Sequence, residues 1–157
     1  MRLNDFSINF NVRFTKLAKA IINQQIQQQV VDLYATVGVQ IEDGHSKQAL
    51  DMLFEFIRSA NRYFDEQQPW RTIHEQPEKC SETLATCVFI IQNLSQLLQP
   101  FLPFACLEIQ KMLGITAEQW AIQKELPIQL AEVAPIYERI DVKLIDEELL
   151  KLKGKSK

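Results

Sequence analysis

The chain has 157 residues, of which 46% are hydrophobic and 24% charged, and its formal net charge is −3. This length suits one globular domain, and the acidic balance argues against nonspecific coating of duplex nucleic acid, which needs a basic excess. No apolar run approaches the roughly 20 residues of a membrane-spanning helix, and no secretory signal is visible, so we expect a cytoplasmic protein with no membrane partner.

A first amphipathic helix is predicted over residues 4–23. The glutamine-rich run at 24–29 keeps a helical stripe, and glutamine is a good helix former, so this helix can continue toward Tyr34. Gly38 and the polar cluster at 42–46 then predict a break. The apolar side chains at three- and four-residue steps are Phe6, Phe10, Phe14, Leu17 and Ile21.

Two longer helices are predicted over 47–64 and 81–98, with Ser46 and Ser81 as their N-caps. Between them, Gln67-Gln68-Pro69-Trp70 ends the first of the two, and 71–79 is expected to be an irregular connection. The side chains expected on the buried faces are Leu50, Leu53, Ile57, Ala60 and Phe64, and then Leu84, Val88, Ile91, Leu94 and Leu98.

A further helix is predicted over 103–113, ending at Gly114, and the stretch 115–135 is expected to be rich in loops. A short last helix is expected over 144–152. The sequence therefore predicts an all-α fold, a helical bundle of four to five helices in one domain over 1–150, with a basic flexible tail at 151–157.

Signals for catalysis are poor. His45 and His74 have no metal-ligand spacing, and the chain contains no glycine-rich phosphate loop. Cys80, Cys87 and Cys106 form no C-x-x-C pair and are best interpreted as small buried thiols in a reduced compartment. We therefore expect no catalytic residue, no metal and no cofactor in this chain.

Asn61 falls at the edge of an apolar helical arc, between Ile57 and Phe64. A polar amide in this position costs free energy unless it is hydrogen-bonded. Either it binds a neighbouring backbone group, or it contacts a ligand or the following loop.

Asn9 and Arg13 are four residues apart, so they lie on one edge of the first predicted helix. An amide beside a guanidinium can bind the edge of a base or a phosphate. The alternative is an ordinary pair on a helix surface.

Trp70 follows Pro69, whose ring restrains the backbone at the exit of a helix. The indole either plugs the end of the bundle or is presented for stacking on a base. Both interpretations remain open at this level.

The run from Ala60 to Trp70, A-N-R-Y-F-D-E-Q-Q-P-W, resembles the A-N-x-Y-x-(D/E)-x-x-x-P-W segment in the anticodon-binding domain of methionyl-tRNA synthetase, a class I synthetase. The resemblance covers nearly the whole chain. It includes Asn4-Asp5 followed by N-x-x-x-R, the L-x-P-F-L-P turn at 98–103, and P-I-Y-E-R-I-D at 135–141. It implies a tRNA anticodon-binding site of five residues, with the tryptophan stacked on the first anticodon base. These residues are Asn9, Arg13, Asn61, Pro69 and Trp70.

The chain departs from the family pattern in places. The glutamine run replaces the usual K-Y-F-D-G ending of the first helix, and Glu138 stands where the family has a proline before Arg139. The family's nucleotide-binding domain, with its H-I-G-H and K-M-S-K-S elements, is absent, so we expect that this chain does not activate methionine by itself.

Two functions follow from this pattern. In the first, the chain is an anticodon-binding bundle that supports methionyl-tRNA aminoacylation, with tRNA and a synthetase catalytic domain, in cis or in trans, as partners. In the second, it is a protein–protein interaction module derived from that domain and has no RNA binding.

Overall fold

The structure is a computed structural model that describes residues 21–116, 119–127, 130–131, 133–137, 145 and 151. The described residues form helices and irregular segments and contain no strand, which confirms the predicted all-α class. The predicted helix over 4–23, with Asn9 and Arg13, lies outside them except for its last three residues. The predicted helix over 144–152 also lies almost wholly outside, and the domain limit at 150 with its tail stays a prediction.

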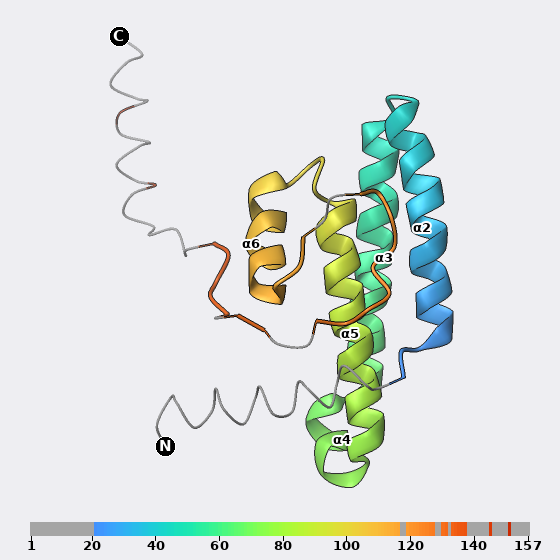
Figure 1. The fold of residues 1–157 in the computed structure, drawn as a ribbon, viewed down its shortest axis with the longest axis vertical. Coiled ribbons are helices and arrows are strands. Elements are labelled where there is room, and N and C mark those ends of the chain that lie inside the picture. The colour runs from blue at the N-terminus through green and yellow to red at the C-terminus, as the bar shows by residue number, and fades with distance from the viewer. Residues whose placement is uncertain are drawn as a thin grey trace.

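Three long helices form the body of the bundle: α2 (Gln24–Glu42), α3 (Ser46–Gln67) and α5 (Pro77–Leu97). They pack side by side, with the short α4 (Pro69–Glu75) at one end and α6 (Pro103–Leu113) against α5 (Figure 1). The fully buried apolar side chains at the centre come from all three long helices. They include Val30, Val37, Leu53, Phe89 and Leu97.

Helix α2 begins at Gln24 and does not continue from residues 21–23. Residues 21–23 are not helical, and the Asn23 side chain accepts a hydrogen bond from the Ile26 amide as the N-cap. The prediction that the first helix runs through to Tyr34 is therefore wrong. The break at the polar cluster is confirmed, because α2 ends at Glu42 and Gly44 takes a positive φ of 77° in the turn.

Gly38 does not break α2, contrary to the prediction. It lies inside the helix, and the Trp120 ring packs over it. A Cβ atom at this position would lie 3.1 Å from Trp120 Nε1. The glycine is explained by the close approach of a distant side chain.

Helix α3 confirms the predicted second helix and extends it to Gln67. Leu53 is buried as expected, but Phe56 is buried beside it and Ile57 is only half-buried. Ser46 is the first helical residue and His45 holds the N-cap position without a side-chain bond, so the predicted serine cap is wrong.

Helix α5 is longer than predicted and buries a different face. It begins at Pro77, a favourable first position because proline lacks the N–H that would be unpaired there, so Ser81 lies inside it. Ile91, predicted to be buried, is 45% exposed, whereas Gln92 and Asn93 are fully buried. Leu84, Val88, Leu94 and Leu98 are half-buried.

The buried polar side chains of α5 hold a strap formed by residues 119–127. Gln92 Nε2 donates to the Gln123 carbonyl at 2.8 Å, and Asn93 exchanges hydrogen bonds with the backbone of the same residue. Asn93 also lies 3.1 Å from the Tyr34 hydroxyl of α2. Because backbone amides of the strap need partners where they are buried, the amides of α5 turn inward in place of apolar side chains.

Helix α6 agrees with its predicted bounds. It begins at Pro103, and Gly114 ends it in the left-handed conformation with φ 62°. The described part of the stretch 115–135 contains no helix, as expected for a loop-rich region.

Candidate functional site

The sharp bend between α3 and α4 is made by one residue, Gln68. Its φ of 47° makes it the one described non-glycine residue with positive φ, a conformation that L-residues seldom adopt. The bend is nevertheless well bonded, because the Gln68 amide donates to the Phe64 carbonyl and the Gln68 carbonyl accepts from Arg71 and Thr72. The Gln68 side chain accepts a further bond from Arg71 Nη1 at 3.1 Å.

The stretch after this bend is helix α4 and not the irregular connection that was predicted. Pro69 stands at its first position, where proline favours a helix start. Pro69 and Thr72 are three residues apart and buried, and the Pro69 carbonyl accepts a weak hydrogen bond from Cys80 Sγ of α5 at 3.5 Å. This anchoring fixes which way the next residue points.

Trp70 points away from the bundle and is 54% exposed. Its ring makes a tilted contact with Phe64 of α3, with ring centroids 5.7 Å apart and an interplanar angle of 58°. A large aromatic side chain thus leaves half of its surface in solvent and is supported from one side, as the interpretation of a presented ring requires. The interpretation as a plug of the bundle end is not supported.

Asn61 is exposed on α3, and its side chain makes no hydrogen bond to another described residue. The predicted alternative of an internal bond to the backbone is therefore not found within the described part of the chain. Asn61 precedes Phe64 by three residues, so its amide lies on the flank of α3 to which the aromatic pair belongs.

Sequence reasoning missed two residues of this surface, Arg71 and His74. Both are exposed on α4 and follow Trp70 by one and four residues. Once 69–75 is known to be helical, the i, i+4 spacing places His74 on the same face as Trp70. The sequence signal for helix α4 was present in Pro69 and Pro77, because proline favours the first position of a helix and these two residues begin α4 and α5.

A hollow of about 820 Å³ lies at the same end of the bundle, between α3 and the start of α5. Ile21, the first described residue, lines it together with Tyr63 and Gln67 of α3. Burial raises the pKa of the Tyr63 hydroxyl further above neutral pH. Ile21, the first described residue, therefore lies at the end of the bundle that α4 occupies.

The described residues offer little for catalysis. Burial raises the pKa of Cys87 to about 11, which keeps its thiol protonated and unreactive at neutral pH. No group of three or more His, Cys, Asp or Glu side chains within the described part of the chain can hold a metal ion. No described helix is long and apolar enough to cross a membrane.

Comparison with known proteins identifies the family of the chain. The family described as "Anticodon binding domain of methionyl tRNA ligase" matches residues 14–148. Methionine–tRNA ligase of Streptococcus pneumoniae (strain CGSP14) is 47% identical over 125 residues, which is 80% of this chain and 23% of that protein. Methionine–tRNA ligase of Bacillus cereus (strain G9842) is 42% identical over 136 residues, 87% of this chain and 25% of that protein.

Among solved structures, the fold is similar to that of the free state of Mycobacterium tuberculosis methionyl-tRNA synthetase, with a TM-score of 0.61 and 19% identity. That match covers 85% of this chain and 31% of the other. The chain thus spans about a quarter of the length of the curated relatives it matches. On the family match and these identities, the chain belongs to the family of anticodon-binding domains of methionyl-tRNA ligase.

Proposed function

We propose that this chain binds the anticodon loop of a methionine-accepting tRNA, with Trp70 as a stacking platform for an unpaired base. The observation that carries the proposal is the half-exposed Trp70 ring on the bend between α3 and α4, in a chain of this family. Base–aromatic stacking is worth about 1–3 kcal/mol per base.

The other site residues have distinct roles in this proposal. Asn9 binds the edge of the stacked base, and Arg13 binds a base or a phosphate. Asn61 holds the RNA loop beside Trp70. Its amide is suited to this role because it is exposed and makes no hydrogen bond to another described residue. Pro69 is buried and orients Trp70 through the start of α4.

The net charge of −3 is compatible with this function. Sequence-specific binding of RNA targets unstacked loop bases by stacking and hydrogen bonding, so it requires fewer cations than binding to a duplex backbone. Arg71, held by Gln68, supplies one local positive charge next to Trp70.

In the complete reaction, a synthetase catalytic domain acts on the same tRNA, in cis or in trans. The curated relatives are about four times longer than the matched region, which supports a separate catalytic part. The chain would then contribute binding of the tRNA and not methionine activation. We place this function in the cytoplasm.

A gel-shift titration at low salt, with initiator and elongator methionine tRNAs and a non-methionine tRNA, tests the proposal. We expect complexes with both methionine tRNAs that weaken when the anticodon is changed. Equal affinity for all three tRNAs would contradict anticodon recognition.

One observation favours the second candidate, a protein-interaction module. Phe54 of α3 and Ile91 of α5 are 46% and 45% exposed, and this candidate would use such apolar side chains to contact another polypeptide. This module would bind no methionine tRNA in the titration above, so the same experiment separates the two functions.

A further inference from the structure

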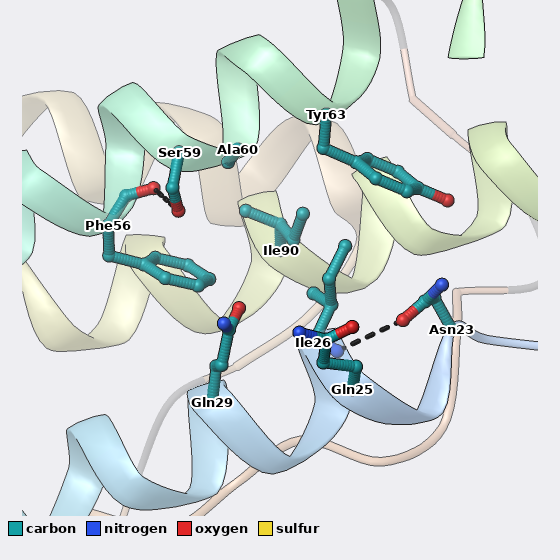
Figure 2. A pocket seen from close by; sticks show the side chains of 9 residues that line it. All are labelled: Asn23, Gln25, Ile26, Gln29, Phe56, Ser59, Ala60, Tyr63 and Ile90. Atoms are coloured by element: carbon teal, nitrogen blue, oxygen red, sulfur yellow. Dashed lines mark hydrogen bonds between the residues drawn. The ribbon is translucent and has the colours of Figure 1, made fainter. Parts of the chain in front are cut away.

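A second, smaller pocket lies between α2 and α3. Its volume is about 170 Å³, less than the ~300–1,000 Å³ of sites for drug-sized ligands. Figure 2 shows apolar side chains from three helices in its interior and amide side chains of α2 at its edge. A pocket of this size takes one flat ring system.

The floor of this pocket is apolar and rigid. Ile26, Phe56 and Ile90 are 5–8% exposed and belong to the central core of the bundle. They come from α2, α3 and α5, so the floor exists only in the folded bundle. Such a surface favours the face of an aromatic ring over a flexible polar ligand.

The edge of the pocket has unused hydrogen-bonding groups. Gln25 and Gln29 are exposed, one helical turn apart, and make no hydrogen bond to another described residue. Asn23 uses its side-chain oxygen to accept from the Ile26 amide at 3.1 Å, and its NH₂ group has no described partner. Three primary amides therefore offer donors and acceptors around an apolar floor (Figure 2).

All the side chains that line the pocket are neutral. A phosphate or a carboxylate would lack a cation there, so the ligand is an uncharged flat group with hydrogen-bonding edges. Nucleobases have this chemistry, and glutamine and asparagine amides pair with bases that present a donor and an acceptor side by side, as adenine does.

We infer that this pocket binds a second unstacked base of the RNA, separate from the base on Trp70. The inference rests on the proposed function. The same stretch of α3 serves both places, because Tyr63 lines the pocket and its neighbour Phe64 supports Trp70. Tyr63 and Phe64 are adjacent and an α-helix is about 10–12 Å across, so an RNA loop that passes this end of the bundle can place one base in the pocket and another on Trp70.

The glutamine run provides a matched pair of variants for the test. Gln25→Met with Gln29→Met removes the two glutamine amides from the pocket and leaves that of Asn23. Gln24→Met with Gln28→Met makes the same change on solvent-facing positions, where Gln28 donates only to Asp32 at 2.8 Å. Methionine and glutamine are similarly good helix formers, so all four substitutions preserve α2. Circular dichroism and thermal unfolding check the fold.

The test measures binding of the full 157-residue chain to a hairpin RNA with the methionine anticodon loop, and to a set of hairpins that each lack one loop base. We expect the pocket variant to bind the intact hairpin about tenfold more weakly, since one good amide–base pair is worth about that factor. The control variant should bind like the unmodified chain.

The missing-base hairpins then identify the base. One of these hairpins should bind the unmodified chain and the control variant about tenfold more weakly than the intact hairpin does. The affinity of the pocket variant for this hairpin should be no lower than that of the unmodified chain, because the base that the pocket would bind is already missing. This base should differ from the one whose removal abolishes the effect of Trp70→Ala. The second site does not exist if the pocket variant binds the intact hairpin as tightly as the control does. It also does not exist if the pocket variant binds every missing-base hairpin more weakly than the unmodified chain does. The proposed function itself fails only if the unmodified chain does not bind the intact hairpin.

Discussion

The two tryptophans of this chain have similar exposure and very different surroundings. Trp120 is 42% exposed and Trp70 is 54% exposed. The Trp120 indole donates to the Tyr34 carbonyl at 3.0 Å, packs edge-on against the Tyr34 ring and lies over Gly38. Trp70 has one tilted contact with Phe64 and no hydrogen bond to a described residue.

This difference distinguishes a tryptophan that stabilises the fold from one that has few internal contacts. Trp120 is fixed by a polar bond, an aromatic contact and a glycine that leaves room for it, so it fastens the strap to α2. Trp70 is held through the backbone of Pro69, the bend at Gln68 and one ring contact with Phe64. Exposure alone would not distinguish the two rings, whereas their contacts do, and we propose Trp70 as the ring that stacks on a ligand.

The largest expected effect on stability comes from the hydrophobic core, against which both regions pack. Leu53 of α3 is fully buried at the centre of the bundle. Leu53→Ala should cost about 2–5 kcal/mol in free energy of unfolding, because it removes buried methyl groups and leaves a cavity. Urea unfolding followed by circular dichroism measures this loss, and a cost below about 1 kcal/mol would contradict the central position of Leu53.

Truncation of each tryptophan tests the comparison directly. Trp120→Ala should lower the free energy of unfolding by about 2 kcal/mol, less than the ~3–5 kcal/mol of a fully buried ring, because Trp120 is partly exposed. Trp70→Ala should change it by less than about 0.5 kcal/mol, as for a surface substitution. Equal costs for the two variants in urea unfolding would remove the distinction.

RNA binding should show the opposite order. Trp70→Ala should weaken binding to a methionine tRNA by about 1–3 kcal/mol, the worth of one stacked base. Trp120→Phe should leave the affinity unchanged, since its ring is committed to the strap. Fluorescence titrations of both variants give the two affinities, and a loss confined to Trp120→Phe would reverse our assignment.

Salt dependence sharpens the role of Arg13, which lies outside the described residues. If Arg13 contacts a phosphate, Arg13→Gln should weaken binding and reduce the slope of log affinity against log salt by about 0.7, the value for one contact to a single strand. An unchanged slope with weaker binding would indicate a contact to a base edge instead. Titrations at several salt concentrations measure the slope.

The smallest effect concerns Gly38 under the Trp120 ring. Glycine to alanine inside a helix normally stabilises by up to ~1 kcal/mol. Gly38→Ala should gain less, because the new Cβ lies 3.1 Å from Trp120 Nε1 and the ring must shift. Thermal unfolding of Gly38→Ala in the normal chain and in Trp120→Ala compares the two backgrounds. The full gain should appear only in Trp120→Ala.

Local pattern predicted much of this molecule. The apolar spacing of 47–64 and of 103–113 predicted α3 and α6, because a helix that buries one face repeats its apolar residues every three to four positions. The proline and tryptophan at 69–70 indicated a helix exit, where the ring could either plug the bundle end or face outward, and Trp70 is exposed there. The same run of residues also indicated the family.

Contacts between distant residues decided what the pattern did not show. Periodicity finds one apolar face, but α5 is surrounded by α2, α3, α4 and α6 and by the strap, so it buries Gln92 and Asn93 and exposes Ile91. Gly38 was interpreted as a helix break because its reason, the Trp120 ring, lies 82 residues further along the chain. The amide pocket likewise needs α2, α3 and α5 together. Spacing along a chain reports the preferences of one helix, whereas only packing determines which faces meet and which polar groups must be satisfied.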